Sequence, residues 1–147
     1  MKAMFFLCLL IFSTNANAQD VLPDGWHLNL ESRANSVNGD FNGSGHPERA
    51  VLITDGYNSM VAAFIYDKGK MSVVSLFDTI HEPSALTLKM VPPGEYKTAC
   101  GKKYYGCSPD ESESVHINRP AISFADENVE ILFVFDGGAV KKIWLSD

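Results

Sequence analysis

The chain has 147 residues, with 12 basic and 18 acidic side chains and a formal net charge of −6. Such an acidic chain is repelled by nucleic acids and anionic lipids before contact forms, which argues against both as partners. Its length and its 46% hydrophobic residues suit one ordinary domain with its own core.

The first twenty residues, MKAMFFLCLLIFSTNANAQD, have the features of a secretory signal peptide. Lys2 precedes an apolar run from Met4 to Phe12, and an Ala-Asn-Ala sequence ends at Ala18. This run is shorter than the roughly 20 residues needed to span a bilayer, which disfavours a membrane anchor. We expect cleavage after Ala18, leaving residues 19–147 as a single β-rich domain. The predicted location is the bacterial periplasm, with secretion as the alternative.

The stretch NGDFNGSGHPERAVLITD, residues 38–55, places oxygen-bearing side chains at alternate positions around glycines. This spacing matches the start of a calcium loop, although Val51 stands where an EF-hand has its bidentate glutamate. The candidate ligands are Asp40, Asn42, Ser44, His46 through its backbone carbonyl, and Glu48. The alternative is a polar turn in which Asp40 and Asn42 cap backbone amides and no metal is needed.

The segment GDFNGSGHPERAVLI resembles the DxNGDGxxDxxv loops of FG-GAP and VCBS-type repeats, in which an aspartate-rich turn before a strand holds calcium. The resemblance implies that Asp40, Asn42, Ser44 and Glu48 are ligand positions. Ser44 and Glu48 each stand where those loops usually have aspartate. With only Asp40 and Glu48 as carboxylates, the site would bind Ca²⁺ weakly, with a dissociation constant on the order of 10⁻⁴ to 10⁻³ M.

Short β-branched or aromatic runs bounded by turn residues follow, with little helical periodicity. They predict strands at residues 50–54, 61–66, 72–77, 86–90, 115–117, 129–135 and 140–145. Glycines in YDKGKM and FDGGAV suit tight hairpins. A short helix is expected within residues 26–34 or near residues 83–86. The predicted fold is a mainly β, single small antiparallel domain, sandwich or half-barrel-like, with little helix.

Once Cys8 has left with the signal peptide, Cys100 and Cys107 are the two remaining cysteines. An even number of cysteines in an exported chain predicts a disulfide, here stapling a short hairpin in YKTACGKKYYGCSPD. A redox pair or half a zinc site would need C-x-x-C spacing or a second ligand pair, and the sequence has neither.

The tip of the predicted hairpin carries candidate partner-binding residues, because tyrosines on rigid loops often supply contact area. These residues are Lys102, Lys103, Tyr104 and Tyr105. In the alternative interpretation, Tyr104 packs inward and the lysines only keep the turn soluble.

The segments GEYKTACGKKYYGC, INRPAISF and KKIWLSD resemble segments of a group of small exported bacterial proteins that pair one DxNGDG-like loop with a cysteine hairpin. That resemblance implies a fold type and an envelope location, without a settled activity.

Catalytic motifs are missing from the sequence. The histidines His27, His46, His81 and His116 have no neighbours at a recognised catalytic spacing, and NGSGH is not a G-x-S-x-G elbow. Carboxylate pairs such as Asp110 with Glu111 and Asp126 with Glu127 are expected from the acidic composition alone.

The sequence therefore predicts a non-catalytic periplasmic binding protein with a protein partner in the cell envelope. An inhibitor or immunity protein against a toxin or a cell-wall hydrolase would fit this description. The alternative is a calcium-binding structural module that uses residues 40–48. An enzyme is a third possibility, which would need a carboxylate pair in a deep cleft.

Overall fold

The computed structural model describes residues 22–32, 34–79 and 85–146, so the expected signal peptide lies outside the described residues. The strands are β1 (His27–Leu28), β2 (Ser36–Gly39), β3 (Glu48–Thr54), β4 (Ser59–Asp67), β5 (Lys70–Thr79), β6 (Thr87–Val91), β7 (Gly94–Lys97), β8 (Ser114–Ile117), β9 (Ala121–Ala125), β10 (Glu130–Asp136) and β11 (Ala139–Ser146). No α-helix forms among these described residues, where Ala85 alone has 3₁₀ geometry, and no helix there is long and apolar enough to cross a membrane.

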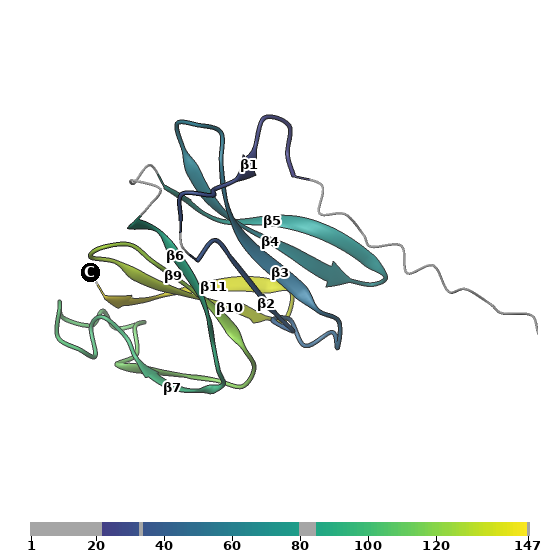
Figure 1. Cartoon of the computed structure of the whole chain (residues 1–147). Helices are drawn as coiled ribbons and strands as arrows, with labels where there is room; N and C mark the ends of the chain where they lie inside the picture. The colour runs from purple at the N-terminus through teal and green to yellow at the C-terminus, as the bar shows by residue number, and fades with distance from the viewer. Residues whose placement is uncertain (1–21, 33, 80–84, 147) are drawn as a thin grey trace, which may run out of the picture.

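Two antiparallel sheets pack face to face as an open sandwich (Figure 1). Sheet A has the strand order β1-β3-β4-β5, with β2 also paired to β3, and sheet B has the order β11-β10-β9-β6. One parallel bridge, between Ala34 and Thr87, links the chain before β2 to β6. This arrangement confirms the predicted mainly β antiparallel domain, in its sandwich form and not as a closed barrel.

The main core lies between the two sheets, where alternate residues of each strand point inward. Its fully buried large side chains include Leu52, Phe124, Ile131 and Phe133. Phe41 belongs to the same core although it comes from the loop between β2 and β3. That loop is therefore anchored in the centre of the domain.

Each sheet also buries part of its outer face, which explains why β3 and β4 are nearly continuous apolar runs. On sheet A, the buried outer residues are Val51, Ile53, Ala62 and Phe64, and Leu22, Trp26, Leu28 and Met60 pack against them. On sheet B, a separate cluster joins Ile117 and Ala121 to Leu132 and Leu145. The hairpin of β7 and β8 contributes to that cluster through Tyr96, Val115 and Ile117.

Residues 92–120 form an excursion from sheet B. The chain leaves at Val91 and returns at Ala121, and these two residues are direct partners in the pairing of β6 with β9. Within the excursion, β7 pairs antiparallel with β8 as a two-stranded sheet, and residues 98–113 form a long loop between them. The excursion is thus a large addition at one end of a pair of neighbouring strands.

All seven predicted strands are confirmed, as β3, β4, β5, β6, β8, β10 and β11. Both predicted tight hairpins are confirmed as well. Lys68 and Gly69 connect β4 to β5 with φ of 48° and 82°, and Gly137 and Gly138 connect β10 to β11 with φ of 57° and 87°. Positive φ at both central residues gives the backbone twist that suits two-residue hairpins.

The expected helix within residues 26–34 is wrong, because His27 and Leu28 pair with Thr54 and Ile53 at the edge of β3. Pairing with a strand edge satisfies their backbone groups, which a short isolated helix could not match in stability. Of the other expected helix, residues 83 and 84 lie outside the described residues, while Ala85 has 3₁₀ geometry and Leu86 is not helical. Strands β1, β2, β7 and β9 were not predicted, since most are short and polar.

Candidate functional site

The loop of residues 40–47, between β2 and β3, closes on itself through its own side chains. The carboxylate Oδ2 of Asp40 accepts a hydrogen bond from the Gly45 amide at 3.0 Å, and Asn42 Oδ1 accepts one from the Ser44 amide at 2.8 Å. Ser44 Oγ accepts one from the His46 amide at 3.3 Å. These are the amide-capping contacts that a polar turn requires.

The same loop is tied to two distant segments. Asn42 Nδ2 donates to the backbone oxygen of Tyr66 at 2.8 Å, and its own carbonyl accepts from Arg119 Nη1, beyond β8. Gly43 has a φ of 77°, and a Cβ there would lie 2.8 Å from the Arg119 guanidinium. The positive φ favours glycine at this position, and a larger residue would also displace the end of the Arg119 side chain.

Glu48, the first residue of β3, is a buried carboxylate that accepts hydrogen bonds from the loop. Its side chain is 1% exposed. Its Oε2 accepts from the amides of Phe41 at 3.0 Å and Asn42 at 3.1 Å, and its Oε1 accepts from the Tyr66 amide at 3.0 Å. Burial raises the pKa of Glu48, with a smaller contribution from Asp40, while the three amide hydrogen bonds act in the opposite direction.

The predicted calcium ligands therefore have divided roles. Asp40, Asn42 and Ser44 line the loop, and Asp40 Oδ1 is buried without a hydrogen-bond partner. Glu48 faces backbone amides, and the imidazole of His46 packs at a tilt of 49° against the Tyr66 ring, with 4.1 Å between centroids. Within the described ranges, no three His, Cys, Asp or Glu side chains gather closely enough to hold a metal ion.

An open groove of about 690 Å³ lies beside this loop. Its apolar lining comes from both sheets through Ile65, Val74, Phe135 and Val140. The loop contributes Asn42, Gly43, Ser44 and His46, and the β4–β5 hairpin contributes Tyr66, Asp67, Lys68 and Gly69. The loop is thus one wall of a shallow surface depression.

The second candidate region is the loop of residues 98–113, which we call the stapled loop. Cys100 and Cys107 form the predicted disulfide, with 4.9 Å between their Cα atoms. Both cysteines lie in the connection between β7 and β8, and not on paired arms of a hairpin as expected. Thr98 closes the base of the loop, because its Oγ1 donates to the Ser112 carbonyl at 2.8 Å and accepts from the Gly101 amide at 3.1 Å.

The stapled loop is also attached to the edge of sheet B. The Ala99 amide donates to the carbonyl of Trp144 at 2.7 Å, and Lys102 Nζ donates to the carbonyl of Leu145 at 2.7 Å. Gly101 packs so closely that a Cβ there would lie 1.8 Å from the backbone oxygen of Glu113. The loop therefore covers backbone carbonyls at the edge of β11.

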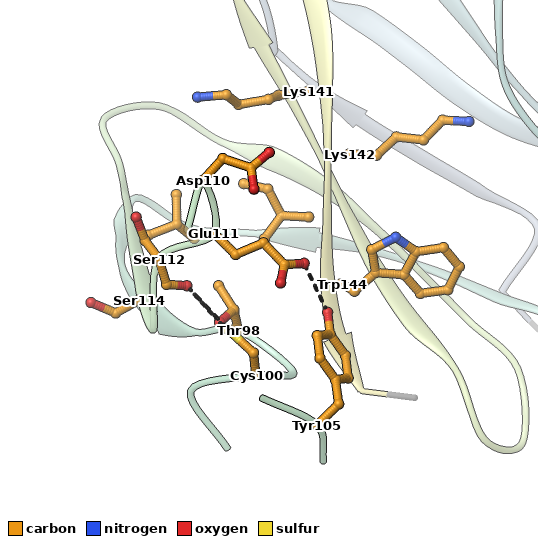
Figure 2. Close-up of a pocket in the computed structure, with 12 residues that line it drawn as sticks. Thr98, Cys100, Tyr105, Asp110, Glu111, Ser112, Ser114, Lys141, Lys142 and Trp144 are labelled. Atoms are coloured by element: carbon orange, nitrogen blue, oxygen red, sulfur yellow. Dashed lines mark hydrogen bonds between the residues drawn. The ribbon is translucent and has the colours of Figure 1, made fainter. Parts of the chain in front are cut away.

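A groove of about 220 Å³ runs between the stapled loop and β11 (Figure 2). Figure 2 shows Lys141 on the side of β11 where Asp110 lies, and Lys142 and Trp144 pointing to the other side. Tyr105 stands beneath Glu111 and donates its hydroxyl to Oε1 of that carboxylate at 3.2 Å. The walls of the groove thus combine aromatic rings with charges of both signs.

Glu111 is fixed as an acceptor in this groove. Its Oε2 accepts from the Ser108 amide at 2.9 Å, and this bond is the main reason why the pKa of Glu111 lies below its usual value. The Tyr105 hydroxyl adds to the effect. These hydrogen bonds favour the charged form of Glu111.

The predicted partner-binding residues differ in how free they are. Tyr104 is 57% exposed, so the alternative in which it packs inward is wrong. Lys103 is exposed and has a φ of 68°. The ammonium of Lys102 holds the loop to Leu145, and the Tyr105 hydroxyl holds Glu111, so both residues also support the loop.

Trp144, which is 38% exposed beside the loop, was not predicted as a contact residue. The sequence signal for Trp144 lies in KKIWLS. Side chains alternate between the two faces of a strand, so Trp144 shares a face with Lys142, and the lysine indicates that this face is exposed.

No family model, curated protein or solved structure matches the chain. The resemblance of the loop at residues 40–48 to FG-GAP and VCBS-type loops stays a prediction from its residues.

Proposed function

We propose that this protein is an exported, non-catalytic binding protein whose stapled loop contacts a protein partner in the cell envelope. The observation that carries the proposal is a rigid loop surrounded by exposed aromatic rings. Tyr104, Tyr105 and Trp144 are 57%, 36% and 38% exposed, and all three lie on or beside this loop. Large aromatic side chains with a polar end are enriched where proteins bind each other.

The sandwich does not need the stapled loop for its own connectivity. Val91 and Ala121 are paired neighbours, and a short turn would join β6 to β9. Ordered loops longer than about 12–15 residues are uncommon in small domains and usually serve a function. The length of residues 98–113 therefore supports a role in recognition.

The loop is also preorganised. The disulfide, the Thr98 bonds and the attachment of Lys102 to Leu145 fix its backbone before any partner arrives. Ordering a flexible segment on binding costs conformational entropy, so a loop fixed in advance binds more tightly for the same contacts. This fits an inhibitor or immunity protein better than a passive surface turn.

Charge and location agree with a partner in the envelope. Cleavage after Ala18 removes Lys2 from the 12 basic residues and leaves 11 against 18 acidic ones, a net charge of −7. An acidic protein attracts a basic toxin or cell-wall hydrolase. The Cys100–Cys107 disulfide suits an oxidising compartment, for which we propose the bacterial periplasm.

The test is capture of partners from envelope extract by the mature protein with its disulfide intact. We expect one specific protein to be retained, and its hydrolytic or toxic activity to fall in the complex. The double variant Tyr104→Ala/Trp144→Ala should no longer retain this partner. Tyr57→Ala is the matched control, because Tyr57 is 92% exposed in the ordered β3–β4 turn. Capture that survives the double variant, or is lost equally in Tyr57→Ala, would contradict the proposal.

A second candidate function is weak calcium binding at residues 40–48, favoured by the buried and unpartnered Oδ1 of Asp40. Asp40, Asn42 and Ser44 would supply side-chain oxygens. Glu48 already accepts three amide hydrogen bonds, so it would contribute only by giving some of them up.

Thermal unfolding in EDTA and then in increasing calcium tests this site. A site with a dissociation constant of about 0.1 mM should add about 2.7 kcal/mol at roughly 10 mM calcium, because the ion binds only the folded chain. Asp40→Ala should abolish the rise. A flat response would leave the loop as a polar turn without affecting the proposal for the stapled loop.

A further inference from the structure

Strand β5 is an unprotected edge of sheet A. Among the described residues it pairs only with β4. Its central residues, 71–77, contain neither a charge nor a proline, and Met71 and Val73 are 40% and 42% exposed. Natural proteins usually protect such edges with lysine, proline or a covering loop, because a bare edge pairs with another strand.

The other long edge strand, β11, has these protections. It carries Lys141 and Lys142, and the carbonyls of Trp144 and Leu145 accept hydrogen bonds from the stapled loop. The bare edge of β5 is therefore not a general feature of this fold.

Backbone groups on β5 are directed toward a further strand. In a two-residue hairpin the flanking pair, here Asp67 and Lys70, is hydrogen-bonded, and hydrogen bonding then alternates along the antiparallel strands. The N–H and C=O groups of Met71 and Val73 consequently point away from β4. Each can form the paired hydrogen bonds of another antiparallel strand.

The charges at the ends of β5 select the direction of that strand. Lys68 and Lys70 stand at its beginning and outnumber the one carboxylate there, Asp67 of β4 opposite Lys70, and Asp78 stands near its end. If a second β5 pairs antiparallel, the lysines of each copy lie beside the aspartate of the other. A parallel arrangement would bring like charges together, which is destabilising.

We propose that two copies of this chain pair antiparallel through β5, about a two-fold axis at Val73, so that sheet A continues from one protomer into the next. The exposed side chain of Val73 then packs against Val73 of the second copy, and Met71 lies beside Ser75 of that copy. An interface of this symmetry is closed, so assembly stops at two.

This proposal is independent of the proposed function. β5 belongs to sheet A, whereas the excursion with the stapled loop covers the outer face of sheet B (Figure 1). The two edges are nonetheless close, because Lys142 of β11 lies with its Nζ 5.3 Å from the centroid of the Phe77 ring of β5.

The first experiment is sedimentation velocity of the mature, disulfide-bonded chain over a wide range of concentrations. We expect a monomer–dimer equilibrium with no larger species. Val73→Lys should raise its dissociation constant by about tenfold or more, since it places like charges at the axis. Leu30→Lys is the matched control, because Leu30 is 80% exposed away from β5 and should leave the equilibrium unchanged.

The second experiment tests the direction of pairing with two charge variants, Asp78→Lys and Lys68→Asp/Lys70→Asp. Each variant alone should dimerise more weakly than the natural chain, and a mixture of the two should form a heterodimer. A natural chain that stays monomeric at every concentration, a dimer indifferent to Val73→Lys, or a mixture without heterodimer would overturn the proposal.

Discussion

Hydrogen bonds to carboxylates hold the loop of residues 40–47, whereas a disulfide and attachments to β11 hold the stapled loop of residues 98–113. The first loop inserts Phe41 into the main core, so its integrity and that of the sandwich are linked. The second is built on the outside of sheet B. Damage to the first loop should therefore destabilise the whole domain, and damage to the second should act locally.

Two tryptophans allow this difference to be measured. Trp26 packs against the outer face of sheet A, and Trp144 lies in the groove beside the stapled loop. They are the two tryptophans of the chain. Replacing either with phenylalanine leaves a fluorescence reporter for one region.

The largest effect is expected from Glu48→Ala. The amides of Phe41, Asn42 and Tyr66 would lose their acceptor, at a cost of about 3 kcal/mol or more in the free energy of unfolding. Denaturant unfolding should shift equally at both tryptophans. Glu127→Ala, at an exposed position, is the control. A shift seen only at Trp26 would refute the link between this loop and the whole sandwich.

Gly101→Ala should follow, with a loss of roughly 2 to 3 kcal/mol, because its Cβ has no space beside the Glu113 carbonyl. The stapled loop must move away from β11, which the fluorescence of Trp144 should report before Trp26 responds. Gly106→Ala is a matched control in the same loop, since nothing lies within 4 Å of a Cβ there. Equal effects of the two substitutions would contradict the packing described for Gly101.

Reduction of the disulfide should cost about 2.5 kcal/mol, from the chain entropy of the short loop that it closes. The double variant Cys100→Ser/Cys107→Ser should match the reduced protein. Both should expose the β11 carbonyls of Trp144 and Leu145 while leaving Trp26 unchanged under native conditions. If reduction perturbs Trp26 as strongly as Trp144, the disulfide stabilises the main core and not only the stapled loop.

The smallest expected effect is a pH response of opposite sign in the two loops. The pKa of Glu48 is raised on folding, so its contribution to stability is present at low pH and is lost as pH rises through the raised value. The pKa of Glu111 is lowered, so its contribution is present at neutral pH and is lost as pH falls through the lowered value. Stability profiles of Glu48→Gln and Glu111→Gln, each subtracted from the natural chain, should slope in opposite directions.

Much of the fold could be predicted from the sequence because its signals are local. The runs in β3, β4 and β10 and the glycines at 69, 137 and 138 act within a few residues. The polar strands β2 and β7 carry no such signal, since their pairing depends on partners supplied by other segments.

The sites were harder to predict, because their chemistry depends on distant residues. Spacing placed Glu48 at a ligand position, but its partner Tyr66 lies 18 residues further on. The cysteine pairing was predictable from counting, whereas the bond from Lys102 to Leu145 spans 43 residues. Trp144 became a candidate only when β11 was seen beside the stapled loop.

The direct pairing of Val91 with Ala121 has an evolutionary consequence. Because the excursion begins and ends at one rung of the ladder, residues 92–120 can change in length or content without altering the register of β6 and β9. A change confined to this excursion would give the protein a different binding surface while the sandwich stays the same. Ile117 and Arg119 set constraints on such a change, since a replacement must still supply an apolar side chain to cover Leu132 and a donor to the Asn42 carbonyl.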